Sequence, residues 1–250
     1  MSACQSVMIL GVRIDCISAD AAVARIADFV REGRPRQVVT VNPEFIMAAQ
    51  SDAAFRAVIN QSALALPDGV GVVWASRLLG RPAPERVAGV DTMRRLARLA
   101  AQEGYRLFLL GAAEGVAEAA AAALRAENPG LQIAGTYAGS PAPAEEDAIV
   151  QRVRAAQPHL LFVAYGAPQQ DMWIARMQSR LGVPVAMGVG GAFDFISGRV
   201  KRAPAWMQRL GLEWLYRLAR EPWRWRRMLA LPRFVWRVLW ARWAGRKKEN

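Results

Sequence analysis

The feature that most constrains this chain is a regular alternation of short strand-like runs with longer helical stretches, which extends to about position 196. The strand-like runs are rich in Val, Ile and Leu, and the helical stretches are rich in Ala, Leu and Arg. This order is typical of an α/β domain with a largely parallel sheet. We therefore predict a Rossmann-like sheet with helices on both faces. The expected strands are residues 7–10 and 12–16 as a hairpin, then 37–41, 63–66, 106–110, 131–136, 160–164 and 183–188.

Capping residues and turns set the helix boundaries within this region. Polar side chains such as Ser18 and Asp91 precede helical stretches and can accept hydrogen bonds from the free N–H groups of a first turn. The expected helices run from Ser18 to about Glu32, over 92–103 behind Asp91, over 115–128 and over 144–156.

The sequence changes character after position 198. Pro204, Pro222 and Pro232 are each placed to begin a helix, which predicts three helices of about 9–17 residues each. In the last of them, three tryptophans spaced four and three residues apart share one face. We therefore divide the chain into an α/β domain over 1–198 and a helical appendage over 199–250.

The appendage carries the whole net charge of +12. Residues 1–198 contain 18 basic and 18 acidic side chains, whereas residues 199–250 contain 15 basic and three acidic ones. Seven of the nine tryptophans are also in the appendage. Arginine meets anionic headgroups while indole sits at the boundary between polar and apolar lipid, so this mixture predicts contact with an anionic membrane surface.

Two other interpretations of the appendage stay open. Lys and Arg clusters also suit nucleic acid, but an exposed nucleic-acid arm would be polar between its arginines, and this one is apolar, so we expect no nucleic-acid partner. The tryptophans could instead be core of a helical hairpin, as we expect for two or three of the seven.

The cysteine content and the lack of long apolar runs exclude several classes of protein. Cys4 and Cys16, in a chain with one His, form neither a disulfide framework nor a zinc site. No run approaches the ~18 consecutive apolar residues of a membrane span, and no signal peptide is indicated. Membrane contact is therefore expected to be peripheral and cytoplasmic, and a homo-oligomer is compatible with the sequence.

Five predicted strands end in unusual loops, and in open α/β sheets ligands bind outside the carboxyl ends of the strands. The glycines of two of these loops permit close backbone approach ahead of a helix N-terminus, although each alone is better explained as a plain strand-to-helix turn. Together they favour a nucleotide diphosphate. The loops are residues 40–44, 67–71, 111–115, 165–170 and 189–194, with candidate binding residues Gly111, Gly166, Gln170, Gly190, Gly191, Phe193 and Asp194.

Asp68 is the sharpest single candidate, because a carboxylate between Pro67 and Gly69 is held on a stiff turn that suits a general base. The equally weighted alternative is that it caps the following helix. Thr40 and Asn42 are neutral hydrogen-bonding groups at the neighbouring strand end, with turn formation before a proline as their alternative.

Several common chemistries find no support in the sequence. Asp194 is expected to contact a sugar or to cap a helix, and His159 is expected to be structural. The chain has no GxSxG nucleophile motif and no Asp-x-Asp metal motif, so neither a triad nor a metal-held nucleotide sugar is indicated.

Seven blocks of the sequence, in order, resemble the WecG/TagA/CpsF family of bacterial glycosyltransferases, from about Val7 to about Phe234. The blocks are VTVNPEF (39–45), LPDGVGVVWASR (66–77), ERVAGVD (85–91), FLLGAAEGVAE (108–118), VAYGAPQQDMWI (163–174), MGVGGAFDFISGRVKRAP (187–204) and GLEWLYRLAREPWRWRRM (211–228).

The resemblance implies an inverting transferase, without a cofactor, at the cytoplasmic membrane face. Its donor would be a UDP-sugar of the N-acetylmannosamine, uronic acid or glucose type, and its acceptor a polyprenyl-diphosphate-linked sugar in teichoic acid or polysaccharide synthesis. The catalytic residues carried over from the family are Asp68, Thr40, Asn42, Arg217, Arg224 and Arg227, and Arg86 joins the substrate-binding set.

Three departures from the family pattern concern the loops. Val41 stands where many members have Pro, Gln169-Gln170-Asp171 stands where Lys-Gln-Glu is usual, and Tyr165 replaces a commoner Leu. Losing the lysine removes a cation, so a phosphate role at position 169 is not expected. The competing hypothesis from another class is a non-catalytic α/β protein that binds a membrane or nucleic acid, and a nucleotide-binding regulator is a third.

Overall fold

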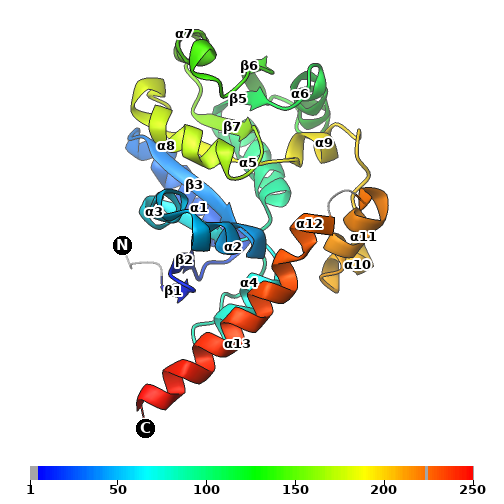
Figure 1. Cartoon of the computed structure of the whole chain (residues 1–250). Helices are drawn as coiled ribbons and strands as arrows, with labels where there is room; N and C mark the ends of the chain where they lie inside the picture. Colours follow the sequence, from blue (N-terminus) through cyan, green and yellow to red (C-terminus); the bar gives the residue numbers. More distant parts are fainter. Residues whose placement is uncertain (1–4, 223–224, 250) are drawn as a thin grey trace.

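A computed structural model describes residues 5–222 and 225–249, and its core is a six-stranded parallel sheet (Figure 1). The strand order is β4-β3-β8-β7-β5-β6, and every neighbouring pair is parallel. The strands are β3 (Arg36–Val41), β4 (Leu64–Pro67), β5 (Arg106–Gly111), β6 (Gln132–Tyr137), β7 (Leu160–Ala164) and β8 (Val185–Gly188). The predicted fold class is confirmed.

The predicted N-terminal hairpin is also present. β1 (Ser6–Ile9) pairs antiparallel with β2 (Val12–Asp15), and the turn between them places Leu10 and Gly11 at positive φ. Asp15 joins the hairpin to the main sheet, because its Oδ2 accepts a hydrogen bond from the Ala65 N–H at 2.7 Å.

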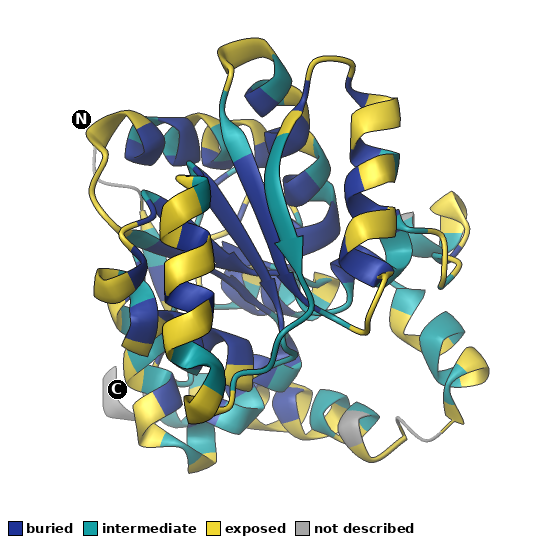
Figure 2. Ribbon diagram, turned by 90° about the horizontal axis from the view of Figure 1, so that it is seen from above, coloured by how far each residue is buried: buried dark blue, intermediate teal, exposed yellow. Residues whose placement is uncertain are grey.

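Helices cover both faces of the sheet, as Figure 2 shows by the dark, buried strands between them. One face packs against α1, α5, α6 and α9, and the other against α2, α3, α7 and α8. The helices are α1 (Ala19–Glu32), α2 (Pro43–Ser51), α3 (Ala53–Gln61), α4 (Val70–Leu78), α5 (Gly89–Glu103), α6 (Val116–Glu127), α7 (Glu146–Ala156) with the 3₁₀ turn η1 (Pro143–Glu145) before it, α8 (Gln169–Leu181) and α9 (Ala192–Ile196).

One predicted helix start is correct and one is wrong. Ser18 caps α1 by accepting the N–H of Ala21. Asp91 is not a cap, because α5 begins two residues earlier at Gly89 and Asp91 lies in its first turn. An ion pair with Arg202 occupies the Asp91 carboxylate instead.

The appendage contains four described helices where three were predicted. They are α10 (Ala205–Arg209), α11 (Glu213–Arg220), α12 (Trp225–Met228) and α13 (Ala230–Glu249). Pro204 precedes α10 as expected and Pro232 lies in the first turn of α13, but Gly211 at φ +74° separates α10 from α11. Proline positions alone therefore set the helix count wrongly.

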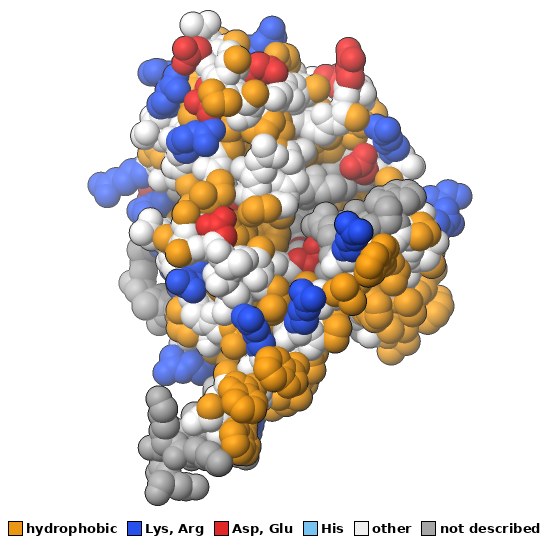
Figure 3. All heavy atoms as spheres, viewed as in Figure 1, with side chains coloured by type: hydrophobic (Ala, Val, Ile, Leu, Met, Phe, Trp, Pro, Cys, Tyr) orange, Lys and Arg blue, Asp and Glu red, His pale blue; other side chains and the backbone are white. Residues whose placement is uncertain are grey.

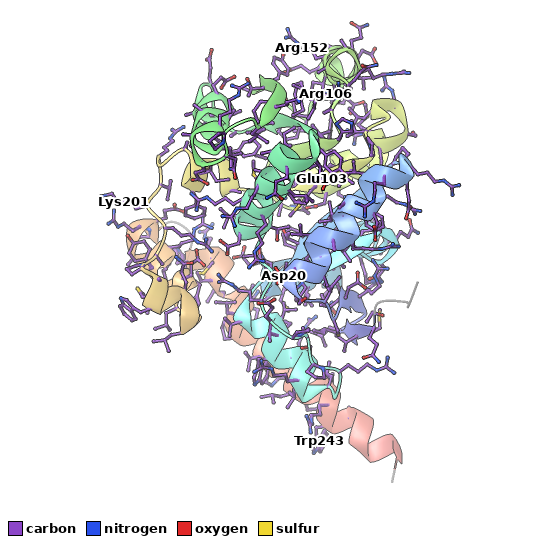
Figure 4. All side chains as sticks on the ribbon, turned by 180° about the vertical axis from the view of Figure 1, so that it is seen from behind. Asp20, Glu103, Arg106, Arg152, Lys201 and Trp243 are labelled. Atoms are coloured by element: carbon purple, nitrogen blue, oxygen red, sulfur yellow. The ribbon has the colours of Figure 1, made fainter. Side chains whose placement is uncertain are left out.

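The last helix, α13, shares a core with the α/β body. Phe234 and Val238 are each 1% exposed and pack with residues of α2 and α4. Arg242 donates a hydrogen bond to the carbonyl of Leu78 at the end of α4. Trp243 lies on the part of α13 that extends beyond the body (Figure 4).

The tryptophans of the appendage that the structure describes are exposed. All six whose side chains the structure describes are more than 40% exposed, while Trp223 lies outside the described residues. The expectation that two or three of them are buried is therefore wrong for the described ones. They are Trp206, Trp214, Trp225, Trp236, Trp240 and Trp243.

Candidate active site

The unusual loops lie along one edge of the sheet, because parallel strands end on the same side. The register pairs Val41 with Pro67, and Val163 with Gly188. The loops that begin at Asn42 and Asp68 are therefore adjacent. The site candidates from these loops come from sequence positions far apart.

Asp68 follows β4 and points toward the start of α5. Its Oδ2 accepts the N–H of Gly89 at 3.3 Å, and Gly69, at φ +118°, begins α4 without a side-chain cap. The alternative that Asp68 caps the helix directly after it is thus wrong. Burial raises the pKa of Asp68 to about 6, against the opposing effects of the Arg86 charge and the Gly89 hydrogen bond. A carboxyl with this pKa can exchange a proton near neutral pH.

Thr40 and Asn42 flank the same corner. Thr40 is buried, and a Cβ placed on Gly89 would lie 3.6 Å from its Oγ1, so Thr40 lies near the backbone that holds Asp68. Asn42 caps α2, with its Oδ1 accepting the N–H of Phe45 at 3.0 Å. Asn42 therefore has a local structural role as a helix cap, which differs from the turn given as its alternative, and its catalytic role stays a prediction.

A cluster of four charged residues ties the appendage to this corner. Arg86 donates to Glu213 at 3.0 Å and lies 3.9 Å from Asp91. Arg202 binds Asp91 through both carboxylate oxygens and also binds Glu213 at 3.0 Å. Burial alone would raise the pKa of Asp91, but the Arg202 hydrogen bonds and charge bring it below its usual value. Because these arginines are held by carboxylates of both segments, α11 is fixed beside Asp68.

Sequence reasoning missed the roles of Arg202 and Glu213. Both lie inside blocks that resemble the family, but no spacing rule pairs residues separated by more than a hundred positions along the chain. Arg202 follows the turn after α9, and Glu213 is the first residue of α11. Only the packing of the appendage on the body brings Arg202 and Glu213 to Asp91 and Arg86.

Arg217 reaches the turn between β8 and α9. A Cβ built on Gly191 would lie 3.7 Å from Arg217 Nη2 and 3.8 Å from Asp194 Oδ2. The Arg217 guanidinium also lies 5.0 Å from the centre of the Phe195 ring, and its Nη2 lies 3.9 Å from Glu221. The structure thus brings three predicted site residues, Arg217, Gly191 and Asp194, to one place.

The other predicted binding residues differ in what they can contact. Gln170 is buried, and its Oε1 accepts the N–H of Gly190 at 3.0 Å, so it holds the turn from beneath. Phe193 is fully buried in the core, which leaves only its backbone for a substrate. Gly111 is fixed by packing, because a Cβ there would come within 2.9 Å of the Ala164 backbone. Gly166, at φ +81°, lies within the loop between β7 and α8.

The two remaining predicted arginines are not located. Arg224 lies outside the described residues, and Arg227 falls in α12 with a side chain that is also outside the description. Their proposed roles stay predictions.

A second carboxyl lies below the site. Asp171 is fully buried, and its carboxyl lies beside the side-chain amide of Gln170 under Gly188. Burial raises its pKa to about 7. A Cβ on Gly188 would come within 2.6 Å of Asp171 Oδ1, so the carboxyl packs directly under the end of β8.

Within residues 5–222 and 225–249, no three His, Cys, Asp or Glu side chains gather in a way that could hold a metal ion. None of the helices described there combines the length and apolar character needed to cross a bilayer.

Comparisons with known proteins agree with the geometry. The model of the Glycosyl transferase WecG/TagA/CpsF family matches residues 7–248. The chain is 40% identical to the N-acetylglucosaminyldiphosphoundecaprenol N-acetyl-beta-D-mannosaminyltransferase of Bacillus subtilis (strain 168), over 81% of this chain and 78% of the relative. It is 32% identical to the protein of the same name from Staphylococcus aureus (strain MW2), over 92% and 91% of the two chains.

Proposed function

We propose, since this chain belongs to the WecG/TagA/CpsF family of glycosyltransferases, that it transfers N-acetylmannosamine from UDP to a polyprenyl-diphosphate-linked N-acetylglucosamine. The activity for which the two relatives are named supports this donor sugar and this acceptor over the uronic acid and glucose alternatives. The product would serve teichoic acid or related cell-surface polymer synthesis. Family membership also favours an enzyme over a non-catalytic binding protein.

The observation that carries the proposal is the corner where Asp68, Arg86 and the start of α5 meet. Asp68 has a raised pKa and one backbone hydrogen bond, which leaves a carboxylate oxygen able to accept a proton. In the proposed step, the acceptor hydroxyl gives its proton to Asp68 while its oxygen bonds to the anomeric carbon. The bond from that carbon to the UDP oxygen breaks on the opposite face, so the configuration inverts.

Arg217 is suited to the leaving diphosphate. It lies against the β8–α9 turn, where Gly190 and Gly191 bring backbone close to a ligand. Guanidinium binds phosphate through paired hydrogen bonds, and charge that grows on the leaving group is stabilised by cations already in place. Arg224 and Arg227 are proposed to add to this charge.

The proposed membrane contact uses the exposed apolar side chains of the appendage. On the face shown in Figure 3, apolar side chains gather over α10 and α11 and again along α13, with Lys and Arg side chains between them. Such a surface suits anionic lipid, because arginine binds headgroups while indole enters the interface. We propose a peripheral position on the cytoplasmic face of the plasma membrane, where a lipid-linked acceptor is present.

The direct test uses purified protein, a panel of UDP-sugars and N-acetylglucosamine linked through diphosphate to a short prenyl chain. We expect UDP release with UDP-N-acetylmannosamine only, and a β-linked product by NMR. Asp68→Asn should lose about 10²–10⁴-fold in turnover. Asp20→Asn, at the exposed start of α1, is the matched control (Figure 4). Transfer by Asp68→Asn at the wild-type rate would refute the role of Asp68, and no transfer by the wild type would refute the function.

A further inference from the structure

A cavity of about 300 Å³ lies between the body and the appendage. That volume is at the lower end of the range for ligand pockets, about 300–1,000 Å³. Its walls come from α2, α3, the β7–α8 loop, α12 and α13. Most lining side chains are apolar, among them Phe45, Met47, Ala48, Phe55 and Ala230.

Among the described residues, the charged ones in the lining are Glu44, Arg226 and Arg233, which give it a net positive charge. Both arginines come from the appendage, and both are exposed. The Arg226 guanidinium lies 5.5 Å from the centre of the Trp225 ring, which is itself exposed. The cavity therefore joins an apolar interior to a cationic and aromatic rim.

The lining of the cavity adjoins the loops of the predicted site. Phe45, which lines it, donates its N–H to Asn42, and its ring lies 5.3 Å from that of Phe55. Ala167 and Pro168, which also line it, directly follow Gly166 in the loop between β7 and α8. The residues that would contact a ligand in the cavity thus lie within a few positions of site residues in the sequence.

We propose that this cavity binds the first isoprenoid units of the lipid-linked acceptor, with Arg226 and Arg233 contacting the acceptor diphosphate. The inference rests on the proposed function and goes beyond it, because it assigns a place to the prenyl chain. The acceptor has an apolar chain, two phosphates and a sugar in series. The structure offers an apolar cavity with two arginines in its lining, next to the loop that carries Asn42. The diphosphate of the acceptor and that of UDP then bind to different arginines.

The occupant follows from this combination of charge and apolar lining. A free nucleotide would leave the apolar walls exposed to water, and an uncharged acyl chain would leave the net positive charge of two arginines against Glu44 without a further anion. Burial of the chain supplies affinity in proportion to the area removed from water, while the guanidiniums orient the anion.

Two acceptors separate this proposal from the function on which it rests. Both carry N-acetylglucosamine on a diphosphate, one ending in a farnesyl group and the other in a methyl group. The assay measures KM and kcat from UDP release, without vesicles, so membrane docking does not contribute. The wild type is expected to have a KM at least about tenfold lower for the farnesyl acceptor, which corresponds to ~1.4 kcal/mol.

Filling the cavity should abolish that preference. Ala48→Phe and Ala230→Phe each add a ring to a lining position, and each should raise the farnesyl KM to that of the methyl acceptor without changing the methyl KM. Ala57→Phe, at an exposed position on α3 outside the cavity, is the matched control. Thermal shift with UDP checks that each variant is folded.

The arginines have a different expected signature. Arg226→Ala and Arg233→Ala should raise KM for both acceptors alike, because both acceptors carry the diphosphate. Equal wild-type KM values for the two acceptors, or a farnesyl preference that survives both cavity-filling substitutions, would overturn the proposal. Failure of the wild type to transfer to either acceptor would instead overturn the proposed function.

Discussion

The raised pKa of Asp68 makes a quantitative prediction for the pH dependence of kcat/KM. With a pKa of about 6 in the free enzyme, the ionised fraction falls from about nine-tenths at pH 7 to about one-tenth at pH 5. Since the base acts only when ionised, kcat/KM should fall about tenfold over that interval. A carboxyl at its ordinary value would stay about nine-tenths ionised at pH 5, with little loss of rate.

The assay is initial-rate UDP release at subsaturating acceptor from pH 4.5 to 8, with circular dichroism to confirm folding at each pH. Arg86→Gln removes the positive charge that lowers the pKa of Asp68, so its acid limb should move to higher pH. Asp68→Asn should retain only residual rate and lose the limb.

Asp171 is the other buried carboxyl near the site with a raised pKa, and it needs its own control. Asp171→Asn should keep the acid limb near pH 6 if Asp68 is the titrating group. A flat wild-type profile between pH 5 and 7, or a limb that disappears in Asp171→Asn, would refute the assignment of the limb to Asp68.

Three further outcomes are expected. Replacing Trp236, Trp240 and Trp243 together with Ser should leave the fold intact, because all three are exposed, and should abolish sedimentation with anionic vesicles; undiminished sedimentation would place the docking surface elsewhere. Transfer should survive EDTA and fall strongly in Arg217→Ala, whereas loss with EDTA and recovery with magnesium would contradict the arginine role. Burial raises the folded-state pKa of Asp171 to about 7, so its ionisation removes stability as pH rises from about 4 to 7; relative to wild type, Asp171→Asn should therefore gain Tm at pH 8 and not at pH 4, as differential scanning fluorimetry can show.

The body of the fold was predictable because its signals are local. Strand-like runs and cap residues such as Ser18 act over a few residues, and each strand-to-helix step repeats the same pattern. Parallel strands then bring the ends of β3, β4 and β8 to one edge without further information. That is why Asp68 and Thr40 could be proposed as neighbours.

The remainder depended on contacts that no local pattern encodes. Asp91 has the sequence position of a cap, but the distant Arg202 binds it and α5 begins earlier. Glycine at position 211 breaks a helix that the prolines alone would leave continuous, because its backbone turns where it meets Val70. Whether an aromatic residue faces lipid or core likewise depends on which side of α13 is covered, and Phe234, not the tryptophans, takes the covered side.

The contact between α13 and the body constrains how segments of this chain can be exchanged in evolution. Phe234 meets the first turn of α4 at Gly71, where Pro43 at the start of α2 also converges. These two helices begin directly after Asp68-Gly69 and Asn42. An exchange of C-terminal segments between relatives would therefore disturb the starts of α2 and α4, and with them the loops that carry Asn42 and Asp68. The exchange would be tolerated only if α2 and α4 were exchanged as well. The segment that touches the lipid and the loops that perform the chemistry must be inherited together.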